Sequence, residues 1–157
     1  MTDKDALLSY YERRTCSAQW MEFNRAFAAE LSAGLPPEDI RQLFRRIGER
    51  IALALPVERC DTVEQLRDGF NARWEAIDWG FATLQEQADH LHIVHACSPL
   101  AMAFGPDTED WASGFFEGAY QTWFAAQGTP PALRVQAEAA PTDGSPQVML
   151  RLGRFQR

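Results

Sequence analysis

Hydrophobic residues repeat with helical spacing in three segments of the first half of the chain. Side chains three and four positions apart share one face of a helix. The repeats comprise Trp20, Phe23, Phe27 and Leu31, then Ile40, Leu43, Phe44, Ile47 and Ile51, then Val63, Leu66, Phe70 and Trp74. Gly34 with Pro36-Pro37 ends the first segment, Pro56 ends the second, and Asp61 with Glu64 resembles a capping box before the third. We therefore predict three helices, each burying its apolar stripe, Trp20 included.

The apolar period changes to two near Ile77. Residues two positions apart share one face of a strand, and two segments show this spacing. They are Ile77, Trp79 and Phe81, and Leu91, Ile93, His95 and Cys97. Glu86–Asp89 has the polar character of a hairpin turn. A helix through residues 82–90 is the main alternative, because ATLQEQA has good helix propensity.

A fourth helix is predicted from near Thr108 to Gly128, and its apolar arc is unusually wide. Two neighbouring faces carry large side chains, namely Trp111 and Phe115 on one and Phe116, Tyr120 and Trp123 on the other. Such a helix is either deeply buried or shared between subunits. Its G-x-x-x-G pair indicates the close approach of a second backbone. The candidate subunit contacts are Gly114, Phe115, Gly118, Tyr120 and Trp123.

Strict alternation returns in residues 133–139 and 147–152, with a turn signal at residues 141–144. This pattern predicts a second antiparallel hairpin. Residues 1–14 are expected to form a mobile arm or one amphipathic turn. The predicted fold is a single α+β domain over residues 1–157. It has four to five helices packed on a small antiparallel sheet of about four strands, arranged as two hairpins.

Composition narrows the functional classes. A net charge of −7 argues against nucleic acid as a partner, since phosphate binding needs a basic surface. The longest apolar stretch, residues 98–106, is far shorter than the about 20 residues of a membrane span. The N-terminus lacks an apolar signal region. Three widely spaced cysteines, Cys16, Cys60 and Cys97, have no zinc spacing, favour reduced thiols, and have no role that we can assign. A cytoplasmic location is therefore expected.

The three histidines raise the question of a metal site. On a strand, His90 and His92 share one face, whereas His95 and Cys97 share the other. No face therefore presents more than two ligands, and a zinc site needs three or four. The remaining donors would have to come from Cys16, Cys60 or carboxylates elsewhere. We predict no metal and no cofactor, with His95 packed inside and the other two histidines exposed.

The chain shows no catalytic constellation. A Cys97–His95 pair lacks an orienting acid, and no nucleophile elbow, P-loop or dinucleotide fingerprint is present. Asp78 beside Trp79 resembles a carboxylate on a sugar-binding platform, but a short Asp side chain more often satisfies local backbone. We predict that the protein is not an enzyme and has no catalytic residues.

Three short motifs resemble the bacterial cellulose synthase operon protein D family, over roughly residues 20–127. They are Ile77-Asp78-Trp79-Gly80-Phe81, Ile93-Val94-His95, and Phe116-Glu117-Gly118-Ala119-Tyr120 followed by Trp123. The family shows I-N-W-G-Y, I-V-H and L-E-G-L-Y, so Asp78 and Phe81 are departures. The resemblance assigns structural signature roles to Trp79, Gly80 and His95.

The resemblance implies a non-catalytic accessory subunit that organises cellulose synthase complexes and the export and crystallisation of glucan, a biofilm exopolysaccharide. It implies a ring-like homo-octamer with the N-terminal segments inside, where Lys4, Tyr10 and Tyr11 would contact glucan. Implied partners are other cellulose synthase subunits or a proline-rich scaffold protein. A periplasmic location is the alternative raised for the family. A fainter similarity to vinyl-reductase-type domains implies a pocket for a small hydrophobic ligand instead.

Overall fold

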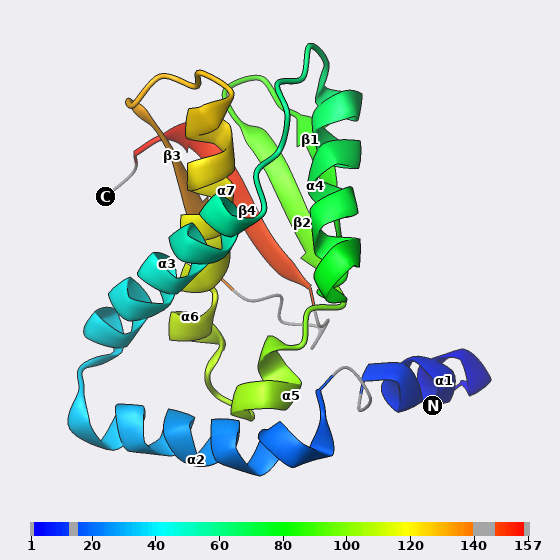
Figure 1. The fold of residues 1–157 in the computed structure, drawn as a ribbon, viewed down its shortest axis with the longest axis vertical. Coiled ribbons are helices and arrows are strands. Elements are labelled where there is room, and N and C mark those ends of the chain that lie inside the picture. Colours follow the sequence, from blue (N-terminus) through cyan, green and yellow to red (C-terminus); the bar gives the residue numbers. More distant parts are fainter. Residues whose placement is uncertain (1, 13–15, 140–146, 156–157) are drawn as a thin grey trace.

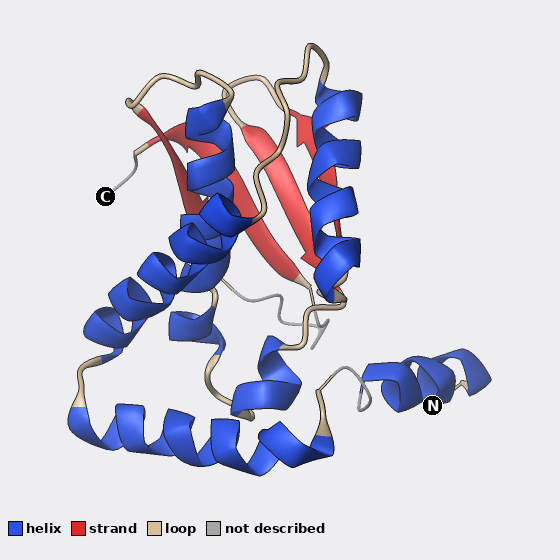
Figure 2. Ribbon diagram, viewed as in Figure 1, coloured by secondary structure: helices blue, strands red, loops and turns tan. Residues whose placement is uncertain are grey.

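The computed structural model describes residues 2–12, 16–139 and 147–155 and has an α+β architecture (Figures 1 and 2). The helices are α1 (Asp3–Glu12), α2 (Ala18–Gly34), α3 (Pro37–Ala54), α4 (Val63–Ile77), α5 (Leu100–Phe104), α6 (Glu109–Ala112) and α7 (Gly114–Ala126). The strands are β1 (Phe81–Glu86), β2 (Leu91–Ala96), β3 (Leu133–Ala137) and β4 (Val148–Arg154). The α+β class and the four-stranded antiparallel sheet are confirmed.

The sheet has the strand order β1-β2-β4-β3, and all neighbouring pairs are antiparallel. In the β1–β2 hairpin, Gln87 N donates to the carbonyl of His90 at 2.9 Å. The strand interpretation of residues 82–86 is therefore correct and the helical alternative is wrong. β3 and β4 pair as predicted, while the predicted turn at residues 141–144 lies outside the described residues.

Helices α4 and α7 cover one face of the sheet, and α3 crosses α7 on the side away from it (Figure 2). The inward-facing strand residues Ile93, His95 and Leu150 are completely buried beneath these helices. His95 is thus packed inside, as its strand position predicted, whereas His90 and His92, which were predicted to be exposed, are half-buried. The core between helices and sheet is largely aromatic, with Phe70, Trp74, Phe116, Tyr120 and Trp123 at its centre.

The first strand begins at Phe81, so the prediction of strand from Ile77 is wrong. Ile77 is the last residue of α4, and Asp78 ends that helix in the left-handed conformation with φ of 61°. Short Asx side chains tolerate this conformation better than other non-glycine residues. Asp78 therefore terminates the helix through its backbone conformation, which the two-residue apolar spacing concealed.

The fourth predicted helix is divided into α6 and α7 at Ser113. The apolar pattern did not predict the short α5, and α1 is a ten-residue helix rather than a single amphipathic turn, so the described residues form seven helices instead of the predicted four to five. Figure 1 shows α2 along one end of the molecule, with α1 beyond it and away from the sheet.

Candidate functional site

His95 lies at the centre of the buried aromatic cluster. Its ring centroid is 5.0 Å from that of Trp74 and 4.1 Å from that of Phe116. Its Nε2 is 2.7 Å from the carbonyl oxygen of Trp79, and its Nδ1 is 2.7 Å from the hydroxyl of Tyr120. The carbonyl can only accept, so Nε2 carries the proton. Nδ1 of the neutral ring then accepts from the Tyr120 hydroxyl.

This hydrogen-bonded chain is complete only when His95 is neutral. The Tyr120 hydroxyl also accepts from Trp74 Nε1 at 3.0 Å. The polar side-chain groups of Trp74, Tyr120 and His95 therefore all have hydrogen-bond partners. Burial lowers the pKa of His95 to about 4, against the opposing effect of the Trp79 carbonyl. Burial also raises the pKa of Tyr120. Both nitrogens of His95 are occupied, which leaves none to activate the Cys97 thiol in a Cys–His dyad.

The Trp79-Gly80 motif supplies the carbonyl group that accepts the hydrogen bond from His95 Nε2. Gly80 has φ of 82°, and a Cβ atom there would overlap the carbonyl oxygen of Ala96. Only glycine combines this backbone conformation with so close an approach. The turn thereby brings the Trp79 carbonyl to His95, while the Trp79 ring packs 4.6 Å from the Phe115 ring between centroids.

Glu117, the polar residue of the E-G-x-Y motif, is buried in an ion-pair network. Its Oε1 is 2.8 Å from Arg41 Nε and 3.0 Å from Arg45 Nη2, and its Oε2 accepts from the Ala137 amide at 2.9 Å. Burial alone would raise the pKa of Glu117, but the hydrogen bonds from Arg41, Ala137 and Arg45 outweigh it and hold this pKa below its usual value. Arg41 also donates to the carbonyl of Asp110. The network therefore joins α3, α6, α7 and β3.

The residues expected at a subunit interface on the fourth helix lie inside the chain's own fold, which corrects that expectation. All five are buried, namely Gly114, Phe115, Gly118, Tyr120 and Trp123. A Cβ atom on Gly118 would overlap the carbonyl oxygen of Arg45, so the second backbone that the glycine pair predicts is α3. Gly48 of α3 completes the contact against Phe115. A glycine in the middle of an amphipathic helix was the signal that the sequence interpretation missed.

Helix α2 does not bury its aromatic stripe, although the sequence predicted that it would. The aromatic side chains of this stripe face outward. Trp20 is 56% exposed and Phe23 is 61% exposed, and their rings meet edge to face with centroids 5.6 Å apart. Ala28, about a quarter turn around α2 from Phe27, is the buried residue of this helix, Leu31 is partly buried against the core, and α2 contacts α5. A single chain offers α2 too little neighbouring structure to cover both sides.

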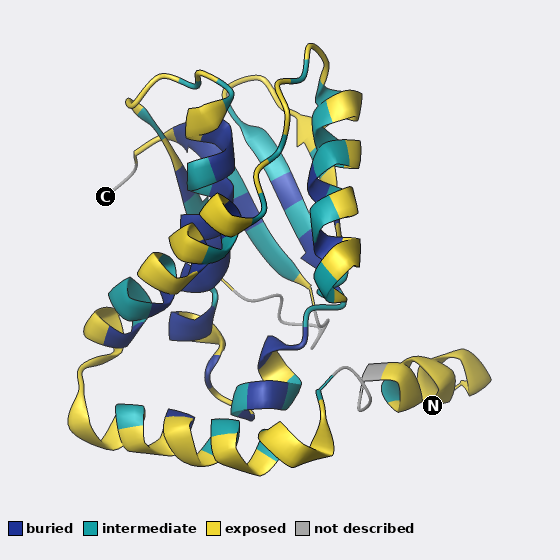
Figure 3. Cartoon of the chain, in the orientation of Figure 1, coloured by how far each residue is buried: buried dark blue, intermediate teal, exposed yellow. Residues whose placement is uncertain are grey.

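Most residues of α1 and α2 are exposed (Figure 3), and several of them have large apolar side chains. We define the N-terminal apolar surface as Leu7, Leu8, Tyr10 and Tyr11 of α1 with Trp20, Phe23 and Phe27 of α2. These are seven of the twelve exposed large hydrophobic side chains in the described part of the chain. Trp20 and Phe23 are in contact on α2, and neighbouring exposed apolar side chains of this kind mark interaction sites. Lys4, Tyr10 and Tyr11, the residues that the resemblance places on glucan, all lie on α1 and are exposed.

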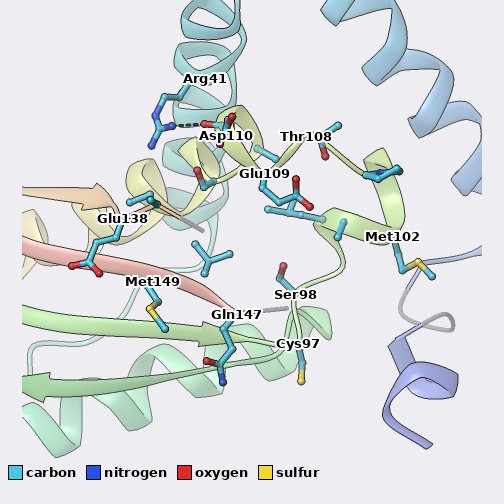
Figure 4. Close-up of a pocket in the computed structure, with 18 of the residues that line it drawn as sticks. Arg41, Cys97, Ser98, Met102, Thr108, Glu109, Asp110, Glu138, Gln147 and Met149 are labelled. Atoms are coloured by element: carbon cyan, nitrogen blue, oxygen red, sulfur yellow. Dashed lines mark hydrogen bonds between the residues drawn. The ribbon is translucent and has the colours of Figure 1, made fainter. Parts of the chain in front are cut away.

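A cavity of about 740 Å³ opens between α5, α6 and the adjoining ends of β3 and β4 (Figure 4). Its lining is mixed, with Met102 and Met149 beside Arg41, Glu109 and Glu138. Figure 4 shows the Cys97 sulfur at its edge, pointing away from Arg41. Among the residues described, no helix has both the length and the apolar character needed to cross a bilayer.

These features define an α+β protein whose buried polar groups hold its helices to its sheet and whose exposed aromatic surface suits association. The chain belongs to the family of the cellulose synthase D subunit, also called cellulose synthase operon protein D, whose sequence pattern matches residues 6–153. The resemblance noted in the sequence is thereby confirmed. Family membership supports a role as an accessory subunit in cellulose synthesis.

Two relatives illustrate the sequence relationship. The chain is 29% identical over 107 residues to cellulose synthase operon protein D of Komagataeibacter xylinus, covering 67% of this chain and 69% of that protein. It is also 29% identical over 109 residues to the protein of the same name from Komagataeibacter sucrofermentans, with coverage of 67% and 69%.

Solved structures resemble the chain at low sequence identity. A trafficking protein particle complex subunit 3 from Naegleria fowleri, covalently bound to palmitic acid, has a TM-score of 0.55 at 11% identity, covering 87% of this chain and 93% of that one. A vinyl-4-reductase family protein from Methanocaldococcus jannaschii has a TM-score of 0.48 at 11% identity, covering 85% and 78%. The first likeness concerns the fold alone, and the second carries no functional weight.

Proposed function

We propose that the protein is a non-catalytic accessory subunit that self-assembles and thereby organises cellulose synthase complexes and their export and crystallisation of glucan. The observation that carries this proposal is the N-terminal apolar surface on a member of the cellulose synthase operon protein D family. Trp20, Phe23 and Phe27 follow helical spacing on one side of α2, so a second helix can cover all three together.

A ring-like homo-octamer is the proposed assembly. The aromatic side chains of the N-terminal apolar surface are of the types that dominate protein interfaces. The remaining surface would meet other cellulose synthase subunits or a proline-rich scaffold protein. The cytoplasm stays the expected compartment, in keeping with three free thiols.

Measuring the oligomer mass tests this proposal. Light scattering coupled to size-exclusion chromatography should give about eight times the 17.7 kDa of one chain. Joint substitution of Trp20→Ser and Phe23→Ser should reduce the mass to that of a smaller species. The matched control is Leu53→Ser, because Leu53 is 70% exposed on α3 but lies outside the N-terminal apolar surface. An unchanged mass in the double variant, or a monomeric parent protein, would contradict the proposal.

We also propose that α1 contacts glucan through Lys4, Tyr10 and Tyr11. Exposed Tyr rings offer flat apolar faces with a polar edge, which suits stacking on sugar rings. Cello-oligosaccharide titration followed by NMR should shift resonances of α1, and Tyr10→Ala with Tyr11→Ala should abolish the shifts. Phe155→Ala is the control, since Phe155 is 63% exposed at the opposite end of the chain. Absence of any shift in the parent protein would exclude this contact.

A second candidate function is binding of a small hydrophobic ligand, favoured by the cavity beside α5. Its volume of about 740 Å³ lies within the range of pockets that hold small molecules. The candidate predicts that a hydrophobic ligand raises the melting temperature and that filling the cavity with Ala112→Phe removes the increase. A melting temperature insensitive to a panel of fatty acids and aromatic ligands would dispose of it.

A further inference from the structure

We propose that His90, His92 and Glu138 form a binding site for a divalent first-row transition-metal ion, with Zn²⁺ as the first ion to test. The site lies on the outer face of the sheet, opposite the buried His95. It is independent of the proposed scaffold function.

The three side chains converge from different parts of the sequence. His92 belongs to β2, His90 immediately precedes that strand, and Glu138 follows β3. One potential ligand atom from each lies within 4.8 Å of the other two. Ligand atoms around a tetrahedral zinc ion are about 3.3 Å apart, given metal–ligand distances of about 2.0–2.2 Å. Side-chain rotation on the half-buried imidazoles and the exposed carboxylate can close this difference.

A neighbouring carboxylate orients the first imidazole. His90 Nδ1 is 2.7 Å from Asp89 Oδ1, and a carboxylate accepts, so Nδ1 donates. The lone pair of the neutral ring is then on Nε2. Metal-binding histidines commonly have such a carboxylate on the non-ligating nitrogen, where it fixes the tautomer and raises ligand basicity. This contact distinguishes the cluster from a chance grouping of surface polar residues.

The local charge permits a cation but limits its affinity. Glu138 and Asp89 contribute two negative charges, while Arg151 contributes a positive charge with its Nη2 4.0 Å from Asp89 Oδ2. The net charge of these groups is negative when the histidines are neutral. Repulsion from Arg151 and the ordering of the exposed Glu138 both weaken binding, so we expect a micromolar Kd.

The donor set indicates the class of ion. Two imidazole nitrogens and one carboxylate oxygen suit zinc and its transition-metal neighbours better than Ca²⁺ or Mg²⁺, which prefer oxygen ligands. Three protein ligands leave the remaining coordination position to water.

The test is calorimetric titration of the untagged protein with Zn²⁺ at pH 7.5, with equilibrium dialysis and metal analysis to count bound ions. One ion per chain should bind. His92→Ala and Glu138→Gln should each raise the Kd at least tenfold, and Asp89→Asn should raise it by about tenfold through the orienting contact. Glu86→Gln, which removes an exposed carboxylate of the same hairpin outside the cluster, should leave the Kd unchanged. Circular dichroism should verify that each variant is folded.

Any of three results would overturn the proposal. One is the failure of the parent protein to bind Zn²⁺ below millimolar concentration. Another is retention of stoichiometric zinc at the parent Kd in His92→Ala, which would place the ion elsewhere, for example on thiols. Mg²⁺ in place of Zn²⁺ should give no heat in the same range, and equal binding of both ions would also contradict the assigned donor set.

Discussion

Helices α7 and α2 both carry an aromatic stripe, but the structure covers only one of them. On α7, Phe116 and Trp123 are at most 1% exposed, whereas on α2 Trp20 and Phe23 are more than half exposed. The apolar pattern placed the α2 stripe in the core and left α7 either deeply buried or shared between subunits. Hydrophobic spacing thus identifies an apolar face, and the neighbouring structure decides what covers it.

The two aromatic stripes differ in burial because neighbouring elements pack more closely against α7 than against α2. Gly114 and Gly118 of α7, together with Gly48 of α3, allow the two backbones to touch, and β3 closes the other side. Within the described part of the chain, helix α2 packs mainly on the short α5, with a smaller contact to α3. One side of α2 therefore stays open in the single chain, which is why we assign association to α2 rather than to α7.

The largest expected effect comes from filling the α3–α7 contact. Gly118→Leu places a side chain into the Arg45 carbonyl, so we expect loss of cooperative folding or destabilisation of roughly 3 kcal/mol or more. Thermal unfolding followed by circular dichroism measures this. The matched control on the other helix is Gly34→Ala, where nothing lies within 4 Å of the added Cβ. Equal stability of the two variants would refute the close contact.

Replacing one tryptophan with alanine on α7 and one on α2 compares the contribution of the two stripes to the free energy of unfolding. Trp123→Ala should destabilise the chain by about 3–5 kcal/mol, because it opens a core cavity and removes hydrogen bonds to the Ala52 and Leu55 carbonyls. Trp20→Ala should change the unfolding free energy by less than about 1 kcal/mol. Both values should come from denaturant titration at concentrations where the chain is monomeric. A large loss from Trp20→Ala would mean that α2 packs within the chain.

Acid should weaken the α7 side of the molecule through His95. Its pKa is about 4 when folded and 6.5 when the ring is exposed to water, so between these values the unfolded chain takes up a proton that the folded chain does not. Stability is therefore complete above pH 6.5 and falls by about 3 kcal/mol as the pH decreases to about 4. Urea titrations across this range measure the slope. His95→Gln should remove this contribution, whereas replacing both His90 and His92 with Ala should retain it.

A smaller loss than that from Trp123→Ala is expected at the buried carboxylate that joins α7 to α3. Glu117→Gln keeps the size of the side chain but removes charge-assisted hydrogen bonds to Arg41 and Arg45, which suggests a loss of about 1–3 kcal/mol. The arginines are partly exposed and can turn toward water, which limits the loss. Urea denaturation should show it, with the exposed Glu138→Gln as a near-neutral control. A neutral result for Glu117→Gln would mean that packing alone holds the contact.

Much of the fold could be predicted from the spacing of apolar residues along the chain. Most wrong predictions occur where helical spacing and strand spacing overlap. Helical spacing located α2, α3, α4 and α7 correctly, and alternation located three strands. The alternation at Ile77 and Trp79 was misleading, because a helix end and a left-handed Asp78 reproduced the spacing of a strand. The His95 interior position was predictable from strand parity, whereas its partner Tyr120 was not.

The sequence by itself determined the apolar faces, the family motifs and the two faces on which the histidines lie. Those properties depend on the order of residues along one element, which the periods of helix and strand make readable. Only the tertiary structure decided that α3 is the backbone against α7, that α2 is uncovered, and that Glu138 comes near His90 and His92. Such contacts join residues that are far apart in the chain. The spacing of residues along one element does not indicate which distant element packs against it.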